Sequence, residues 1–362
     1  MVCMILPHKD KDTQSLMIGL ADPDRWKLIP KSAGLGNSFI RLLRRHLGRG
    51  LPFTNSSAEA SRWARYFDRH PRSTVIIWNG LKGTRRLAAD AARAAGHEVW
   101  FMELSPLPGR ISVDPVGVNH GSSLPRTPSF YAAWRAAHPE IEVDLRMIAA
   151  EIAERPPRAG SGVRHDPLTD EMRNRHFIFV PLQVPDDSQL TEYGAWTNSV
   201  ESFLNALQVA AEHLPAGWDF VVKKHPSATY KFNVEAFGHP RIVFSNTTST
   251  LDLVKHAKAV LTINSSVGLQ AMLFDKPVII TGEAAYNVEG LVERAHDLGG
   301  LCHLVACADT VMPARTDRSN FIAYITQEYY PLASAIRNGT YGLVNARLRH
   351  ERMQELLSCV NP

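Results

Sequence analysis

The sequence predicts an α/β protein with two domains, each built on a mostly parallel sheet with helices on both faces. Short, fully apolar segments alternate with amphipathic helical segments almost throughout the chain, a pattern typical of parallel sheets. The length of 362 residues is more than one hydrophobic core usually serves, and residues 154–169 are rich in proline and glycine. We therefore expect an N-terminal domain over 1–160, a second domain over 161–335, and a C-terminal helix over 336–362 that packs back on the first.

The first half contains three well-defined elements. The apolar run Thr74–Trp78 predicts a buried strand, and an alanine- and arginine-rich helix over Lys82–Ala95 follows it and ends at Gly96. The next strand is Glu98–Met102, and helical spacing returns over Asp144–Ala153. The order of strand, helix and strand is the repeating unit of a parallel sheet.

The second half continues the alternation more regularly. One helix is predicted to start at Asn198, with Glu201 three residues later as its capping partner. The other expected helices are Leu251–Ala257, Val267–Phe274 and Val288–Ala295. The expected strands are Phe177–Val184, Phe220–Lys224, Arg241–Phe244, Ala259–Ile263, Pro277–Thr281 and His303–Val305. Two such domains make a twin-Rossmann architecture, in which the cleft between the domains is the default ligand site.

Charge and composition limit the function classes. The net charge of +4 is too small an excess to indicate nucleic-acid binding, although it suits an anionic substrate or membrane surface. Ser38–Leu47 places Arg41, Arg44 and Arg45 beside leucines, which is typical of a solvated helix, with contact to an anionic membrane surface as the alternative. No apolar run suits a signal peptide or a spanning helix. We expect a cytoplasmic protein, at most peripheral at the inner face of the cytoplasmic membrane.

No metal ion or cofactor is expected. The strings Asp10-x-Asp12 and Asp22-x-Asp24 have a metal-binding spacing, but neither follows a strand, and both are typical of solvated surface. The four cysteines form no Cys-x-x-Cys pair. The short string Gly34–Asn37 lacks a clear preceding strand and the full pattern of a dinucleotide-binding loop.

Unusual polar groups follow three strands of the second domain. They are Asp186 and Asp187 after the first strand, Lys224, His225 and Pro226 after the second, and Asn264, Ser265 and Ser266 after the third. Open parallel sheets bind ligands outside the carboxyl ends of their strands, so we expect the three groups to converge on one rim. Each group alone has an ordinary structural role as a turn, a loop or a helix cap, but their joint occurrence favours a site.

The chemistry of these groups is complementary. Two hydroxyls and free backbone N–H groups at a helix start near Ser265 make an anion site, and His225 and Lys224 add donors and positive charge. A carboxylate across the rim could serve as nucleophile or base, but spacing alone does not decide between Asp186 and Asp187. A phosphate leaving group fits this set.

Longer strings surround these groups in both halves of the chain. They are Gln183–Gln189, Lys224–Pro226 and Ser265–Val278 in the second half, and Trp78–Gly80, Glu103, Pro106–Pro108, Val113–Asn119 and Ser122–Arg126 in the first. Together they resemble the capsule polysaccharide synthesis proteins, bacterial β-Kdo transferases that build a linker on a lipid anchor. The resemblance covers roughly residues 75–295.

This resemblance implies a GT-B fold, with two Rossmann-type domains whose parallel sheets face across a cleft. It also implies CMP-β-Kdo as donor and transfer with retention, with Asp187 as nucleophile and Glu103 as acid/base. His225, Ser265 and Ser266 match the contacts to the CMP phosphate. The remaining residues expected to bind the donor are Gln183, Lys224, Pro226, Asn264 and Gln270, the last standing where the family commonly has Glu.

The implied partners are a CMP-sugar, a glycerolipid or Kdo-lipid acceptor, an anionic membrane surface and capsule assembly proteins. The chain has one catalytic unit, and Tyr286–Leu291 replaces an aromatic string of the two-module members, so it looks closer to the single-module members that add the first Kdo. Three alternatives stay open: an inverting CMP-sialic acid transferase, a nucleotide-sugar epimerase, and a non-catalytic capsule assembly subunit.

Overall fold

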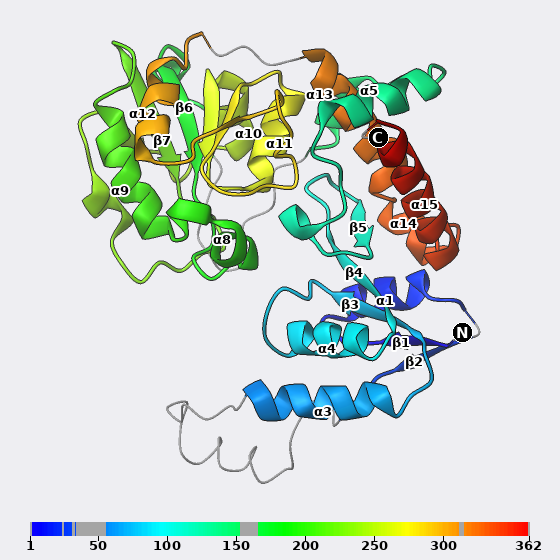
Figure 1. Ribbon diagram of the computed structural model, residues 1–362. Coiled ribbons are helices and arrows are strands. Elements are labelled where there is room, and N and C mark those ends of the chain that lie inside the picture. Colours follow the sequence, from blue (N-terminus) through cyan, green and yellow to red (C-terminus); the bar gives the residue numbers. More distant parts are fainter. Residues whose placement is uncertain are drawn as a thin grey trace, which may run out of the picture. The chain divides into compact units, whose positions relative to one another are not determined.

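The computed structural model describes residues 2–23, 25–30, 33, 56–152, 166–310 and 315–360, coloured along the chain in Figure 1. The chain divides into two compact units. Unit 1 comprises Met1–Ser105, Gly109–Ser123 and Gln327–Glu355, and unit 2 comprises Pro106–Pro108, Leu124–Thr326 and Leu356–Pro362. The arginine-rich segment Ser38–Leu47, the string Gly34–Asn37 and most of the predicted linker lie outside the described residues.

Unit 1 contains a five-stranded sheet of order β2-β1-β3-β4-β5. The strands are β1 Cys3–Ile5, β2 Trp26–Leu28, β3 Thr74–Trp78, β4 Glu98–Leu104 and β5 Ile111–Asp114. β1 to β4 are parallel, whereas β5 runs antiparallel to β4. The helices are α1 Lys11–Leu20, α3 Ser56–Asp68, α4 Gly83–Ala94 and α14 Ala333–Arg337, with the short turn η1 Asn119–Gly121. Helix α15 Leu343–Val360 and the short turn η4 Ile325–Tyr329 lie mostly in unit 1, and one end of each belongs to unit 2. The strands and helix predicted between residues 74 and 102 are confirmed.

Strand β3 shows how this sheet buries both faces. Val75 and Ile77 pack with Trp63 and Phe67 of α3, while Ile76 and Trp78 belong to a second core on the opposite face. Because successive strand residues point to opposite faces, one continuous apolar run serves both cores. The second core contains residues of α1, α14 and α15, the last contributing Leu343 and Ala346.

Unit 2 contains a six-stranded, fully parallel sheet of order β11-β10-β9-β6-β7-β8. The strands are β6 His176–Pro181, β7 Trp218–Lys223, β8 Ile242–Phe244, β9 Ala259–Thr262, β10 Val278–Ile280 and β11 Glu293–Arg294. The helices are α5 Pro128–Ala137, α6 Leu145–Ala150, α7 Asp170–Arg173, α8 Ser188–Tyr193, α9 Val200–Ala211, α10 Thr250–His256, α11 Ser266–Leu273, α12 Leu298–Ala306 and α13 Arg315–Tyr324, with η2 Ala195–Thr197 and η3 Val234–Phe237. The α/β class predicted from the sequence is confirmed for both units.

The division between the units differs from the boundaries expected at residues 160 and 335. Helix α5 belongs to unit 2 because its aromatic side chains pack on α13: the ring centroids of Phe130 and Tyr324 lie 5.0 Å apart, and those of Tyr131 and Phe321 5.1 Å. The chain therefore crosses from unit 1 to unit 2 after Ser123 and returns after Thr326; the short segment Pro106–Pro108 and the end of the chain from Leu356 also belong to unit 2.

Two predicted elements and one cap are wrong. Residues Val288–Ala295 form turns and the short strand β11 rather than a helix, since Gly290 has a left-handed φ of 76°. The predicted strand His303–Val305 lies inside α12, where the buried Leu301 and Val305 are one helical turn apart. The cap of α9 is Ser199, whose side chain pairs reciprocally with Ser202, one residue later than predicted for both partners.

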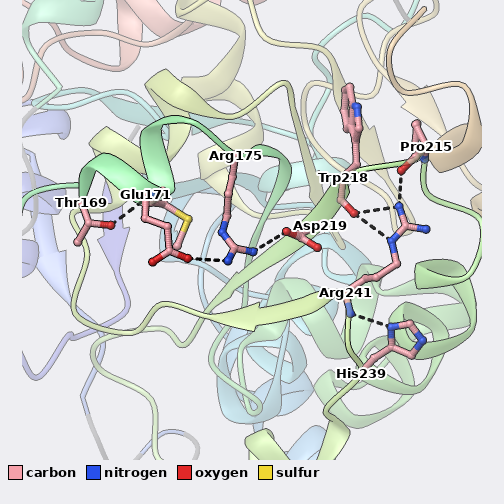
Figure 2. Close-up of polar contacts among 9 residues, drawn as sticks. Thr169, Glu171, Arg175, Pro215, Trp218, Asp219, His239 and Arg241 are labelled. Atoms are coloured by element: carbon pink, nitrogen blue, oxygen red, sulfur yellow. Dashed lines mark hydrogen bonds and ion pairs between the residues drawn. The ribbon is translucent and has the colours of Figure 1, made fainter.

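The amino-terminal edge of the unit 2 sheet is held by two arginines (Figure 2). Arg175, just before β6, binds Glu171 and Asp219 at 2.7 Å each. Arg241, just before β8, donates to the backbone carbonyls of Pro215 and Trp218. It also donates to the backbone carbonyl of Leu214. Both arginines are thus bonded within unit 2 and stabilise the start of the strands. Ligands of open parallel sheets bind at the opposite edge, outside the carboxyl ends of the strands.

Glu98 at the start of β4 anchors helix α15 to unit 1. Its carboxylate accepts hydrogen bonds from Arg347 at 2.8 and 2.5 Å, from Thr74 at 2.7 Å and from Trp100 at 2.8 Å. Burial acts to raise the pKa of Glu98, but these hydrogen bonds and the Arg347 charge outweigh it and lower the pKa to about 2. Folding thus favours the ionised carboxylate.

This pairing predicts acid sensitivity. The folded pKa lies below the ordinary 4.5, so the contribution of Glu98 to the free energy of unfolding is present above pH 4.5 and is lost as the pH falls toward 2. Glu98→Gln removes this contribution and flattens the pH dependence in that window, measured by urea unfolding with tryptophan fluorescence. Glu351→Gln, an exposed change on α15, is the control; equal curves for wild type and Glu98→Gln would contradict the assignment.

Candidate functional site

The three polar groups predicted from the sequence follow three adjacent strands of unit 2. β6 is hydrogen-bonded to β7 on one side and to β9 on the other, and all three are parallel. From β6 the chain builds β7 and β8 outward in one direction, then returns to place β9, β10 and β11 on the other side. The boundary between β6 and β9 is a topological switch point, where open α/β sheets leave a crevice for ligands.

A reciprocal amide pair joins the ends of β6 and β9. The Gln183 Nε2–H donates to Asn264 Oδ1 at 2.8 Å, and the Asn264 backbone N–H donates to Gln183 Oε1 at 3.2 Å. The exposed fraction is 6% for Gln183 and 1% for Asn264. Both residues were expected to bind the donor; in the structure their side chains hold the strand ends together.

The same asparagine fixes the helix that follows β6. Asn264 Nδ2 donates to the backbone carbonyls of Gln189 and Tyr193 in α8, at 3.0 Å each. Asp187 is the N-cap of α8, and its Oδ1 accepts the backbone N–H of Gln189 at 2.9 Å. Asp187 is half-buried and oriented by this contact, whereas its neighbour Asp186 is exposed.

His225 is tied to the end of β6 through a tyrosine that the sequence analysis missed. The His225 backbone N–H donates to Tyr230 Oη at 3.0 Å, and that hydroxyl donates to the Gln183 carbonyl at 3.2 Å. Burial raises the pKa of Tyr230 to about 12, so the hydroxyl keeps its proton at neutral pH. His225 Nδ1 accepts the Ser227 backbone N–H at 3.2 Å, which leaves the ring hydrogen on Nε2 as a donor.

The two lysines at the end of β7 both have partners within the protein. Lys223 is buried, and its Nζ donates to the backbone carbonyls of Asn246 and Thr248. Lys224, expected to bind phosphate, forms an ion pair with Glu235 at 2.6 Å. The hydrogen bond from Lys224 lowers the pKa of Glu235.

The start of α11 packs closely against Tyr286. Ser265 caps the helix, its Oγ accepting the Val267 backbone N–H at 3.3 Å, and its carbonyl accepts the buried Tyr286 hydroxyl. A Cβ on Gly268 would overlap that hydroxyl, so only glycine fits here. Ser266 is half-buried at the first helical position. Gln270, one turn on, donates to the Pro106 carbonyl at 3.5 Å.

Glu103 lies at the carboxyl edge of the unit 1 sheet. Its Oε2 accepts Asn79 Nδ2 at 2.7 Å and its Oε1 accepts the Leu104 backbone N–H at 2.9 Å. Asn79 follows β3 and has a left-handed φ of 63°, which turns its amide toward the neighbouring strand. In the part of the chain that the structure describes, no group of three metal-ligating side chains could hold a metal ion.

Comparisons with known proteins relate part of the chain to a known family. Residues 158–316, which include β6 to β11 and their polar edge, match the family model described as capsule polysaccharide biosynthesis protein. Over this region the chain is similar to that family. Protein FixF from Sinorhizobium fredii is 32% identical over 259 residues, which are 70% of this chain and 59% of FixF. The chain therefore spans little more than half of that relative.

Two further proteins are similar to this chain. The capsule polysaccharide export protein KpsS from Escherichia coli is 24% identical over 68% of this chain and 76% of KpsS. Among solved structures, Thermosulfurimonas dismutans KpsC, titled beta Kdo 2,4 transferase, superposes with a TM-score of 0.52 at 18% identity, covering 89% of each chain. The likeness to KpsC shows a shared GT-B fold.

In the described residues, no helix is both long and apolar enough to cross a membrane.

The tight contact at Gly268 predicts a specific pair of variants. Gly268→Ala forces its Cβ against the Tyr286 ring and hydroxyl, and should lower the free energy of unfolding by about 1–3 kcal/mol. Adding Tyr286→Phe removes the nearest atom, so the double variant should be more stable than the sum of the single changes. Urea unfolding of all four proteins measures this; strictly additive effects would contradict the contact.

Proposed function

We propose that the protein is a glycosyltransferase that moves Kdo from CMP-β-Kdo to a glycerolipid or Kdo-lipid acceptor in capsule linker synthesis. The match of residues 158–316 to the capsule polysaccharide biosynthesis family and a fold shared with a protein titled as a Kdo transferase support this proposal. The observation that carries it is the hydrogen-bonded network that ties the ends of β6, β7 and β9 together at the switch point. That network leaves a capped carboxylate, an imidazole N–H and a helix start at one sheet edge.

In the proposed first step, an Asp187 oxygen attacks C2 of Kdo. The bond from C2 to the phosphate oxygen breaks, its electron pair leaves with CMP, and a sugar ester forms on Asp187. The backbone N–H of Gln189 holds the carboxylate in one orientation while the reaction proceeds. Asp186, exposed and without this cap, is not assigned a role.

The charge that develops on the leaving CMP phosphate needs donors. In this proposal they are His225 Nε2–H, the hydroxyls of Ser265 and Ser266, and the backbone N–H groups at the start of α11. Lys224 is already paired with Glu235, so its charge acts at longer range. No metal ion is needed for a donor with a single phosphate.

In the second step, Glu103 is the proposed base. It takes the proton of the acceptor hydroxyl, whose oxygen attacks C2 and displaces Asp187 as a carboxylate. Two displacements at the same carbon restore the original configuration, so the product retains the donor's anomeric form.

Asp187→Asn tests the nucleophile. The variant should lose transfer by about 10⁴-fold or more while binding CMP within about 3-fold of wild type, because the amide keeps the shape but cannot form the ester. Transfer from CMP-Kdo, made in situ, to a short-chain phosphatidylglycerol is followed by mass spectrometry, and CMP binding by calorimetry. Asp186→Asn is the matched control and should keep wild-type activity.

The same assay decides between donors and reaction types. CMP-sialic acid and a UDP-sugar without acceptor are run beside CMP-Kdo, and NMR gives the anomeric form of any product. An inverted sialoside, or epimerisation of the UDP-sugar, would contradict the proposal. So would CMP binding without transfer to any lipid acceptor, or full activity of Asp187→Asn.

A further inference from the structure

A second polar cluster lies at the carboxyl edge of the unit 1 sheet, and the proposed chemistry uses only its carboxylate. β1, β3 and β4 are adjacent and parallel, so the residues that follow them meet at one edge. His8 follows β1, Glu103 lies near the end of β4, and Arg85 stands in the first turn of α4, which follows β3. All three belong to unit 1.

The imidazole of His8 is oriented by a hydrogen bond between its Nδ1 and the backbone of Asp10. The Asp10 backbone N–H donates to Nδ1 at 3.1 Å, shorter than the alternative 3.4 Å contact of Nδ1 with the Asp10 carbonyl, so the ring hydrogen is on Nε2. The ring centroid lies 6.0 Å from that of Trp78 at the end of β3. Burial, and next the charge of Arg85, lower the pKa of His8, so the ring is a neutral N–H donor at pH 7.

The Arg85 side chain is a half-buried cation. Within the described ranges it makes no hydrogen bond and no ion pair, although its charge acts on both His8 and Glu103. Partial burial lowers its pKa, while Glu103 acts to raise it. A guanidinium presents five donors in a planar fork. The Arg85 nitrogens are not among the described buried side-chain atoms that lack a partner, so they are open to solvent and to a ligand oxyanion.

We propose that Arg85 and the Nε2–H of His8 bind an anionic group of the acceptor substrate, beside Glu103. The proposal rests on the proposed function, because Glu103 is there assigned to the acceptor hydroxyl. The guanidinium fork matches a phosphate or a carboxylate in geometry and charge. The group could be the phosphate of a glycerophospholipid or the carboxylate of a sugar acid already on the lipid, and the experiment separates these sources.

Arg85→Gln is the decisive variant. It should raise the acceptor KM by about 10- to 100-fold with kcat changed by less than about 3-fold, the result of losing a charge-assisted contact made equally in the ground and transition states. Arg85→Lys keeps the charge and should recover part of the loss. Arg86→Gln, on the exposed side of the same helix and 3.9 Å from Asp90, is the matched control and should equal wild type.

Three acceptors distinguish the sources of the anion. Short-chain phosphatidylglycerol carries a phosphate, a methyl Kdo glycoside carries a carboxylate, and a short-chain diacylglycerol carries neither. The acceptor whose KM rises in Arg85→Gln identifies the bound group. An equal effect on the charged acceptors and the uncharged one, or no effect on any of them, would overturn the proposal.

A binding measurement keeps the site testable apart from catalysis. Inorganic phosphate is titrated into wild type, Arg85→Gln and His8→Gln while the His8 ring is followed by NMR in the proteins that retain it. Wild type should show a saturable shift of the His8 ring that Arg85→Gln loses. No shift in wild type would overturn the anion site, whereas a shift without any sugar transfer would preserve the site and remove the proposed function.

Discussion

The reciprocal amide pair between Gln183 and Asn264 is the contact on which the polar edge of unit 2 depends. The ladder between β6 and β9 pairs only Ile178 with Ala259 and Phe179 with Val260, well short of the strand ends. Beyond it, two buried side-chain amides continue the connection to the edge of the sheet. A buried amide left without partners would cost about 1–3 kcal/mol, so each residue of the pair requires the other.

The Gln183–Asn264 pair also contacts the segments on both sides of the switch point. Asn264 also holds α8 through two backbone carbonyls, and α8 begins at Asp187, so a residue after β9 sets the position of a carboxylate after β6. On the other side, Tyr230 passes the connection from Gln183 to the backbone of His225. The groups proposed to do the chemistry are thus held by neighbours with no proposed chemical role, an arrangement that holds a site in one geometry.

Much of this edge could be predicted from the sequence, because apolar strands and the polar residues that follow them are local signals. β3, β9 and the start of α11 follow directly from such runs. Contacts between residues that are not neighbours in sequence could not be predicted in this way. Glu235 pairs with Lys224 from eleven residues away, and the Tyr230 hydroxyl donates to the Gln183 carbonyl. The strand predicted at His303–Val305 was wrong for a different reason. A short apolar run is compatible with a strand as well as with a helix, and here it belongs to α12.

His8 and Arg85 were missed for a physical reason. β1 is only three residues long, too short for its pattern to predict a strand that would place His8 at a sheet edge. Arg85 stands among other arginines of an ordinary surface helix. Only the parallel pairing of β1, β3 and β4 brings these residues to the same edge as Glu103.

A crystal structure of the protein with bound CMP tests the central claim most directly. We expect the phosphate within hydrogen-bond distance of His225 Nε2 and of the hydroxyl or backbone N–H groups at the start of α11, with the Gln183–Asn264 pair unchanged. A nucleotide bound away from the ends of β6, β7 and β9, or one that breaks that pair to reach its amides, would contradict it.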